Sequence, residues 1–351
     1  MNFYLENGYL DMKKIIEKKV PFTFIIGARG IGKTYGALSY YIENVSRGTW
    51  AFMRRTAGEV EILSSPEYNP FQQLNNDNNW NYGVYSNPTT KGKTSAIYER
   101  IETEKGIEPY GEMIAPVFSL STFAGARGFG GANINSIFYD EFIPENHVRK
   151  IRDEGAALMN MYESINRNRE LKGDKPLSLV CASNSNRIDN DILVSFGLVN
   201  ILMKNRKKGN EYYYSPDRGI LVIDVQNSPI SKRKEDTALY RATKDAVNGY
   251  SDMALKNAFP EFSKSEYKHV QLKQLIPIVK VGEITIYRYK SKPKYHVSCH
   301  NSGNPDEYGT SKIELERFAT KYLAIRRAHL TDSITFDDAS CEILLDKYFT
   351  M

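Results

Sequence analysis

The chain has 351 residues, with 47 Lys and Arg against 42 Asp and Glu and a formal net charge of +5. This modest excess excludes strong bulk affinity for polyanions, so any such affinity depends on local clusters of basic residues. Cys181, Cys299 and Cys341 are too few and too scattered for a disulfide framework or a zinc site, which favours a reducing compartment. We find no signal-peptide pattern and no long apolar run, and therefore expect a soluble chain without a membrane span.

Residues 1–21 are expected to form a polar lead and a short amphipathic segment that ends before Pro21. The apolar run from Phe22 is then followed by GARGIGKT, a complete match to G-x-x-x-x-G-K-[ST], which predicts a phosphate-binding loop between a strand and a helix. A chance glycine turn is the alternative. Glycines let backbone N–H groups approach phosphates, Lys33 neutralises the β and γ oxygens, and Thr34 can hold Mg²⁺. The residues predicted to bind nucleotide are Gly27, Ala28, Arg29, Gly30, Ile31, Gly32, Lys33 and Thr34.

A helix is predicted over Tyr35–Val45, and a second apolar strand over Thr49–Arg55. The strand ends in Arg54 and Arg55, at the edge where open α/β sheets place their ligands. These arginines either face nucleotide or DNA, or form a solvated strand end.

Residues 57–116 lack a core pattern, contain an asparagine-rich stretch and two strand-like runs, and are predicted to be an insertion with a hairpin. The loop from Ser121 to Asn133 repeats the letters GARG without the following Lys-Thr, so we predict no second nucleotide site there. Either it is a plain loop, or Arg127 lies beside the nucleotide or DNA.

The second strong signal is NSIFYDEF, residues 135–142, an apolar strand with two carboxylates at its carboxyl end. About a hundred residues after a phosphate-binding loop, this pattern predicts a Walker B strand. Asp140 can orient Mg²⁺, and Glu141 can act as the general base on the attacking water.

The next segment begins with a loop whose basic and titratable residues can contact DNA phosphates or lie on a solvated surface: His147, Arg149, Lys150 and Arg152. A helix follows and ends near Arg167 and Arg169. These two arginines can stabilise the helix C-terminus, or one of them can reach a neighbouring subunit's γ-phosphate as an arginine finger.

Another buried strand is predicted over Leu177–Ala182, followed by Ser183 and Asn184. A polar side chain at this position can sense the γ-phosphate or the attacking water, and a plain turn is the alternative. Residues 192–228 supply an apolar helix, a basic turn and a last strand, which contains Asp224. We predict no nuclease role for Asp224, because no acidic partners lie nearby in the sequence.

Residues 231–262 are polar and helix-prone and predict a helical linker after a P-loop domain at 1–230. The C-terminal domain, 263–351, begins with alternating apolar and basic residues such as ITIYRYK. Interleaved tyrosines and lysines suit contacts with a nucleic-acid backbone and bases, although a solvated sheet face is equally compatible. A long helix and a short acidic end helix are expected to follow.

GARGIGKT, the FYDEF strand end, the RNRE segment and the CASNS strand end together resemble the DNA-packaging ATPases of small tailed phages of the phi29 type. These motifs cover about residues 22–230. The resemblance implies an ASCE-type α/β core with a mainly parallel sheet, in which a catalytic carboxylate strand lies between the P-loop strand and its Asp-bearing neighbour. It also implies ATP and Mg²⁺ as cofactors.

Carried over by motif, the resemblance makes Lys33 and Thr34 phosphate and Mg²⁺ contacts, Asp140 a Mg²⁺ ligand, Glu141 the catalytic glutamate and Arg167 the finger that acts in trans. With Asn184 as the sensor, the implied function is ATP-driven translocation of double-stranded viral DNA into a preformed capsid. The implied partners are a ring of five identical subunits, a portal vertex and a structural RNA. The motor would work in the host cytoplasm, transiently on the prohead.

Related large terminases carry an RNase H-type nuclease built from clustered carboxylates. Here ITIYRYK contains no acidic residue, and the later carboxylates lack an evident strand context; they are Asp306, Glu307, Asp332, Asp337 and Asp338. We therefore expect a small α+β domain with a vestigial nuclease fold used for binding.

Three other functions remain open: a DNA-dependent P-loop ATPase of the helicase or replication type, a P-loop kinase, and a nucleotide-gated scaffold without turnover. The Asp-Glu pair argues against a kinase, which needs no base to activate water.

Overall fold

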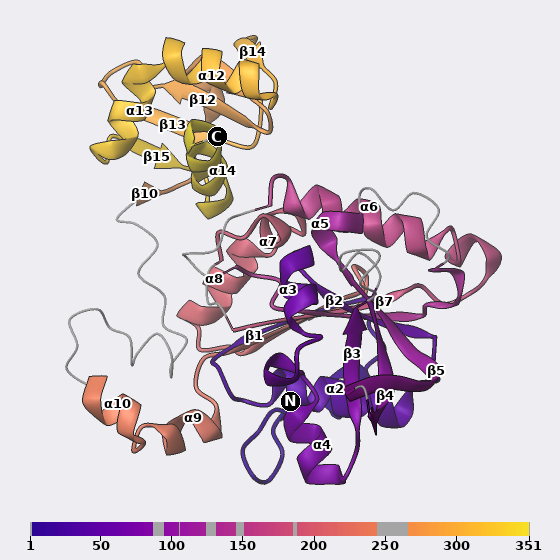
Figure 1. Cartoon of the computed structure of the whole chain (residues 1–351). Helices are drawn as coiled ribbons and strands as arrows, with labels where there is room; N and C mark the ends of the chain where they lie inside the picture. The colour runs from indigo at the N-terminus through magenta and orange to yellow at the C-terminus, as the bar shows by residue number, and fades with distance from the viewer. Residues whose placement is uncertain are drawn as a thin grey trace. The chain divides into compact units, whose positions relative to one another are not determined.

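The computed structural model describes residues 2–86, 95–104, 106–123, 131–144, 151–184, 188–243 and 266–350 (Figure 1). The chain divides into two compact units. The larger unit comprises Met1–Ser195 and Asn205–Ala258, and the smaller unit comprises Phe196–Lys204 and Phe259–Met351. No helix among the described residues is long and apolar enough to cross a membrane.

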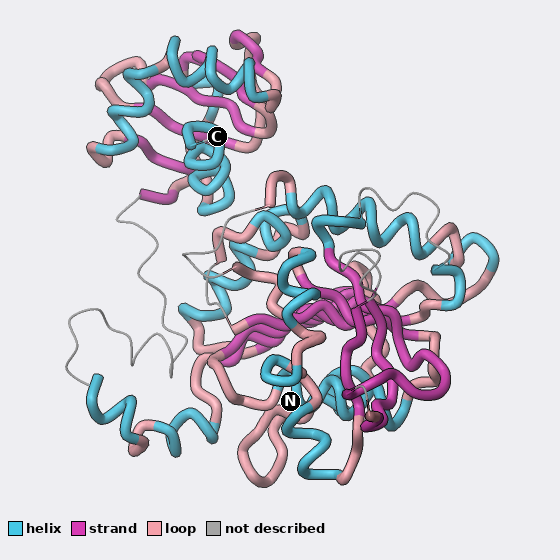
Figure 2. The backbone as a smooth tube through the Cα atoms, viewed as in Figure 1, coloured by secondary structure: helices cyan, strands magenta, loops and turns pink. Residues whose placement is uncertain are grey.

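A nine-stranded sheet forms the centre of the larger unit, in the order β3-β4-β5-β2-β6-β7-β1-β9-β8 (Figure 2). The six strands from β5 to β9 in this order run parallel, and antiparallel strands flank them at both edges. The prediction of an α/β fold with a mainly parallel sheet is confirmed. The strands are β1 (Phe22–Gly27), β2 (Trp50–Arg54), β3 (Tyr82–Ser86), β4 (Ser95–Thr103), β5 (Gly106–Ser119), β6 (Ser136–Asp140), β7 (Ser178–Ser183), β8 (Tyr212–Ser215) and β9 (Ile220–Val225).

Helices cover both faces of this sheet, which explains why its central strands are apolar throughout. On one face, Tyr41 of α2 stacks on Trp50 of β2 with ring centroids 4.8 Å apart. On the other, Tyr162 of α6 packs against Phe22 at the start of β1, at 4.7 Å. The helices are α1 (Met12–Ile16), α2 (Lys33–Asn44), α3 (Ala57–Ile62), α4 (Gln72–Asn78), α5 (Leu120–Phe123), α6 (Glu154–Asn166), α7 (Asp191–Ser195), α9 (Pro229–Lys234) and α10 (Ala238–Thr243), with 3₁₀ turns η1 (Pro66–Tyr68), η3 (Gly131–Asn133) and η4 (Glu170–Lys172). Residues of α8 (Val199–Lys207) belong to both units.

The strand order corrects one expectation. A strand does lie between β1 and the Asp140-bearing strand β6, but it is β7, which carries Ser183 and ends before Asn184. Asp140 is the last residue of β6, and Glu141 follows it directly. The carboxylates and the polar sensor position therefore come from neighbouring strands, so that their side chains meet at one edge of the sheet.

The segment 57–116 is more regular than its composition indicated. It supplies α3, α4, the antiparallel strands β3 and β4, and most of β5, whose end pairs in parallel with β2 at Phe52 and Val117. The segment therefore extends the sheet. The predicted Arg127 position lies outside the described residues.

The smaller unit contains a six-stranded mixed sheet in the order β10-β15-β13-β12-β11-β14. Its strands are β10 (Glu266–Tyr267), β11 (Ile276–Val281), β12 (Ile284–Arg288), β13 (Tyr295–Ser298), β14 (Asp306–Tyr308) and β15 (Ile334–Phe336). The predicted long helix is interrupted at Tyr322, giving α12 (Lys312–Lys321) and α13 (Leu323–Leu330). A 3₁₀ turn, η5 (Leu272–Gln274), precedes β11. The end helix α14 (Ala339–Thr350) has 12 residues, most of them buried and apolar, and is therefore longer and less acidic than the short acidic helix we expected.

The acidic residues of the smaller unit also need a correction. Asp306 and Glu307 do lie on a strand, β14, where they contact Lys321 and Lys280. Asp337 follows β15 and accepts a hydrogen bond from buried His296 at 3.0 Å. Within the described ranges, no three His, Cys, Asp or Glu side chains are grouped as metal ligands.

Candidate nucleotide-binding site

The glycine-rich loop connects β1 to α2 at the carboxyl edge of the parallel sheet, as predicted. Gly32 caps α2 with φ +93°, a left-handed conformation that favours glycine. Lys33 is the first residue of the helix, and its Nζ donates to the carbonyls of Gly27 and Ala28, at 2.8 Å each. Burial lowers the pKa of Lys33 to about 8, against the opposing effect of the Glu141 and Asp140 carboxylates.

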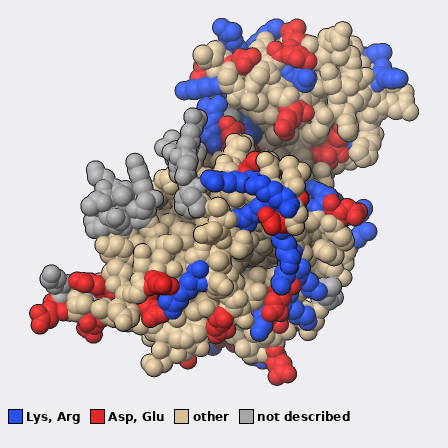
Figure 3. Space-filling model, turned by 90° about the vertical axis from the view of Figure 1, so that its right-hand side faces the viewer, with Lys and Arg blue, Asp and Glu red and all other residues tan. Residues whose placement is uncertain are grey.

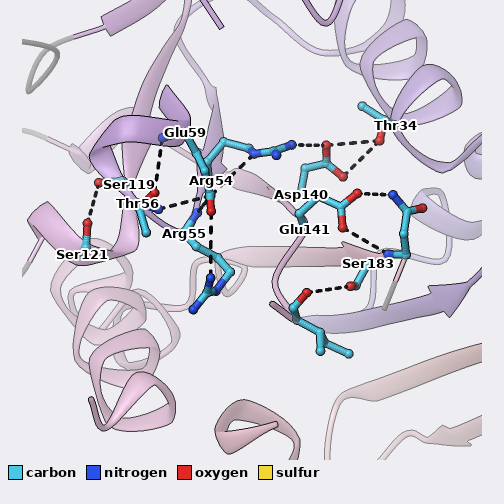
Figure 4. A network of polar contacts seen from close by, with 12 residues as sticks. Thr34, Arg54, Arg55, Thr56, Glu59, Ser119, Ser121, Asp140, Glu141 and Ser183 are labelled. Carbon is cyan, nitrogen blue, oxygen red and sulfur yellow. Dashed lines mark hydrogen bonds and ion pairs between the residues drawn. The ribbon is translucent and has the colours of Figure 1, made fainter. Parts of the chain in front are cut away.

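The end of β6 brings Asp140 to the helix that follows the loop (Figure 4). Thr34 Oγ1 donates to the two carboxylate oxygens of Asp140, at 3.1 and 3.2 Å. A hydroxyl and a carboxylate are hard oxygen donors of the kind that Mg²⁺ takes alongside phosphate oxygens. The fold thus brings together two residues, 106 positions apart, that the sequence predicted as Mg²⁺ ligands, and their oxygen atoms suit that ion.

Glu141 and Asn184 face each other directly beside this pair. The Asn184 backbone N–H donates to Glu141 Oε2 at 3.2 Å, and its side-chain Nδ2 donates to Oε1. Glu141 adopts φ +56°, unusual for a residue other than glycine, and this turn directs its side chain back toward β7. Burial and the charge of Asp140 raise the pKa of Glu141.

Arg54 completes the carboxylate cluster. Its Nη1 donates to Asp140 Oδ2 at 2.9 Å, so Asp140 lies between Arg54 and Thr34 (Figure 4). Arg54 is therefore not a solvated strand end: its side chain is 20% exposed and lies against Asp140, and a contact with nucleotide or DNA stays a prediction. Arg55 follows neither of the two predictions for this strand end, because it is buried on the opposite side of the strand and pairs with Glu154 of α6 at 2.7 Å.

A capping box holds the Arg54–Arg55 strand end in place. Thr56 Oγ1 accepts from the backbone of Glu59, and the Glu59 carboxylate accepts from the backbone N–H groups of Arg55 and Thr56, at 2.9 and 3.3 Å. Because successive strand residues point to opposite faces, fixing this backbone sends the two arginines in opposite directions.

The remaining loop residues divide by their environment. Arg29 is exposed, and its carbonyl accepts a hydrogen bond from Lys234 Nζ at 2.7 Å. Ile31 is fully buried in the core beside α1, and its carbonyl accepts from the backbone of Leu10. Its contribution to binding is therefore limited to its backbone. We did not predict Lys234, because it comes from a helix with an ordinary polar pattern about two hundred residues after the loop.

Arg167 lies at the other end of the sheet from this site. Helix α6 starts at Glu154, beside Arg55, and ends where Asn166 accepts a hydrogen bond from the backbone of Leu177, just before β7 begins. Arg169 then donates to the carbonyls of Ala132 and Ile134, before β6 begins. Since these strands are parallel, Arg167 occupies the amino edge of the sheet, away from its own phosphate-binding loop.

Arg167 makes the contact expected of a residue at a helix end, whereas the Arg169 side chain contacts the segment before β6. Arg167 Nε donates to Ser164 O in the last turn of α6, at 3.1 Å. Arg152 is exposed and contacts Asp153 at 3.5 Å. The other residues of the predicted basic loop, His147, Arg149 and Lys150, lie outside the described residues. On the face drawn in Figure 3, Lys and Arg side chains gather on the larger unit with acidic side chains among them.

The family profile described as Podovirus DNA encapsidation protein (Gp16) matches residues 110–286. This chain belongs to that family. It is 25% identical over 194 residues to the DNA packaging protein of Bacillus phage phi29, a match that covers 54% of this chain and 51% of the phi29 protein. It is 26% identical over 241 residues to the DNA packaging protein of Bacillus phage B103, covering 67% and 63%. The chain thus spans about half the length of the phi29 relative.

The fold is also shared with solved structures. The Phi-28 gp11 DNA packaging motor superposes with a TM-score of 0.64 at 17% identity, over 99% of both chains. The bacteriophage Phi-29 viral genome packaging motor assembly gives a TM-score of 0.58 at 17% identity, over 97% of this chain and 98% of that one. Both likenesses extend over the two units and establish the shared fold.

Proposed function

We propose that this family member is the ATP-hydrolysing subunit of a viral DNA-packaging motor. The observation that carries the proposal is the convergence of Lys33, Thr34, Asp140 and Glu141 at one edge of the sheet. A phosphate-binding loop alone suits kinases, GTPases and motors. A carboxylate placed as a base beside the metal-ligand carboxylate favours attack by water, and therefore hydrolysis.

Each side chain has a defined task in this proposal. Lys33 and the loop N–H groups bind the β- and γ-phosphates, while Thr34 and Asp140 hold Mg²⁺. When bound, Mg²⁺ neutralises charge on the phosphate oxygens. Glu141 accepts the proton of the attacking water, and its raised pKa makes it a stronger base than an ordinary carboxylate. Asn184 orients the carboxylate of Glu141 through its two hydrogen bonds.

Arg167 is proposed to act on the neighbouring subunit. Its place at the amino edge is incompatible with contact to its own loop, whereas an adjacent subunit can bring it to a second site. An arginine supplied in trans would stabilise charge that develops on the γ-phosphate. Hydrolysis would then occur at subunit interfaces of a ring, for which we propose five copies in the host cytoplasm, bound transiently to a prohead.

Translocation of double-stranded DNA is proposed from family membership and from the packaging motors that share this fold. Arg152 and the predicted loop residues His147, Arg149 and Lys150 are candidate phosphate contacts. A portal vertex and a structural RNA are the further partners that the resemblance implies. We propose that the smaller unit is a vestigial RNase H-type domain that binds one of these partners and does not cut DNA.

The test combines steady-state ATP hydrolysis, with and without double-stranded DNA, and a mass measurement of the assembly. We expect DNA-stimulated release of phosphate by a ring. Lys33→Ala should abolish nucleotide binding, whereas Glu141→Gln should bind ATP normally and lower turnover at least about 100-fold. Wild-type turnover in Glu141→Gln would refute the base assignment.

The same assay separates the alternatives. A kinase would transfer phosphate to an acceptor other than water, and a nucleotide-gated scaffold would bind ATP and DNA without releasing phosphate. A helicase or replication ATPase would hydrolyse ATP with DNA but would separate strands, which a fluorescent duplex reports. Any of these results would overturn the packaging proposal.

A further inference from the structure

Lys234 ends a helix that returns to the phosphate-binding loop. Strand β9 lies beside β1, with Val225 paired to Gly27 at the start of the loop. Helix α9 then begins at Pro229, where Ser228 caps it by accepting from the backbone of Ser231 at 3.1 Å. The helix is short and ends at Lys234, which places this residue over the loop.

The contact between Lys234 and the loop is close. Nζ donates to Arg29 O at 2.7 Å, and a β-carbon added to Gly30 would lie only 2.2 Å from Nζ. Gly30 also has φ +68°. Glycine at position 30 therefore serves two purposes, because it allows this backbone conformation and leaves room for the ammonium group.

More positive charge lies near the phosphate-binding loop than a purely structural hydrogen bond from Lys234 would need. Lys33 and Lys234 both donate to carbonyls of the same loop, and exposed Arg29 belongs to that loop. The proximity of Lys234 and Arg29 contributes to lowering the pKa of Lys33. In the described part of the chain, no acidic side chain forms an ion pair with Lys234. Lys234 is half-buried, and a second ammonium beside the buried Lys33 is unfavourable unless an anion joins the two.

We infer that Lys234 is a second phosphate-binding lysine, which contacts the phosphate chain of the nucleotide together with Lys33. This inference rests on the proposed nucleotide site and adds a residue from outside the loop. Lys234 can keep its hydrogen bond to Arg29 O while another ammonium proton reaches a phosphate oxygen, because the group has three donors. Since α9 is the first helix after the sheet, a bound phosphate would also anchor the start of the connection toward the smaller unit.

Two substitutions separate a phosphate contact from a structural hydrogen bond. Lys234→Gln keeps a donor and loses the charge, whereas Lys234→Arg keeps both. We expect Lys234→Gln to weaken binding of ATP and ADP about 10- to 100-fold by titration calorimetry, the range typical of a charged hydrogen bond. Lys234→Arg should restore most of this affinity. The exposed neighbour Lys232, replaced by Gln, is the matched control and should bind like wild type.

Amide hydrogen exchange gives an independent readout. ATP should slow exchange in α9 of the wild-type chain and of Lys232→Gln, but not of Lys234→Gln. The inference is overturned if Lys234→Gln binds ATP as tightly as wild type, or if Gln and Arg restore binding equally, which would indicate a structural bond only. If the wild-type chain binds no ATP at all, the proposed function itself fails, a result distinct from these.

Discussion

Arg54 affects two carboxylates at once. It contacts Asp140 at 2.9 Å, and its charge lowers the pKa of Glu141, against the larger effects of burial and of Asp140 that raise it. A general base must be ionised, so turnover should fall as the pH drops through this raised pKa.

Replacing Arg54 by Gln removes the cation that favours the ionised form of Glu141. The pKa of Glu141 should then rise further, and the acid limb of kcat should move to higher pH than in wild type. The measurement is a kcat profile from about pH 5 to 9. Arg47→Gln, at an exposed arginine paired with Glu99, is the control and should leave the profile in place. An unmoved acid limb in Arg54→Gln would mean that Arg54 does not act on the base.

Lys33 predicts a different pH dependence, on the alkaline side. Its pKa of about 8 means that the nucleotide-free chain loses this ammonium as the pH rises through that value. A neutral amine contributes no charge to phosphate binding, so ATP affinity should fall about tenfold for each pH unit above 8. Lys33→Arg stays charged and should bind more weakly but without a change of slope there. Constant wild-type affinity up to about pH 10 would contradict the burial of this group.

At the scale of elements, the buried pair of Arg55 and Glu154 joins the end of β2 to the start of α6. Their side chains are 1% and 3% exposed and lie 2.7 Å apart. Burial raises the pKa of Glu154 despite the opposing effect of Arg55. Removal of one partner leaves an uncompensated charge in the interior.

We therefore expect Glu154→Leu to lower the free energy of unfolding of the larger unit by about 3–5 kcal/mol. The double variant Arg55→Leu, Glu154→Leu should recover much of this loss. Urea unfolding followed by tryptophan fluorescence is suitable, because Trp50 and Trp80, the only two tryptophans, both lie in the larger unit. Glu99→Ala breaks an exposed pair with Arg47 and should cost less than about 1 kcal/mol. Equal effects at positions 154 and 99 would refute the argument.

Elements with long apolar runs could be predicted from the sequence, because burial on both faces leaves a continuous signal. The strands β8 and β14 could not. Their sequences, YYYS and DEY, are short and polar, and they are strands because a neighbour supplies hydrogen bonds. The break between α12 and α13 at Tyr322 could not be predicted either, because the sequence on both sides has a continuous helical pattern.

The candidate site follows the same division. Lys33, Thr34, Asp140, Glu141 and Asn184 could be predicted, because each stands at a motif position or at the end of a buried strand. The opposite orientations of Arg54 and Arg55 could not be predicted, because a shift of one residue at a strand end exchanges the two faces of the sheet. Lys234 reaches the loop only through the path of the folded chain after β9.

At the scale of the whole molecule, the trans role that we propose for Arg167 would make each active site depend on two subunits. Lys33→Ala and Arg167→Ala should each be inactive alone. In a 1:1 mixture, a subunit with an intact loop can receive Arg167 from a neighbour, and about one quarter of sites should be complete. Hydrolysis by the mixed, reassembled protein is the measurement.

The control mixture combines Lys33→Ala with Glu141→Gln. Lys33 and Glu141 contribute to the same site from one subunit. Every site in the mixed ring therefore lacks one of these two residues. No recovery is expected. Absence of recovery with Arg167→Ala as well, in rings shown to be mixed, would exclude a role in trans.

The position of β1 within the sheet has a consequence during protein synthesis. This strand leaves the ribosome early, but its two neighbours, β7 and β9, begin only at Ser178 and Ile220. Until β7 has been made, the nascent chain carries an apolar strand with two unpaired hydrogen-bonding edges, and one edge stays open until β9 follows, a form prone to aggregation. A chain truncated before Ile220 would keep one of these edges open, and its phosphate-binding loop would lack the neighbouring strand that pairs with β1 up to Gly27.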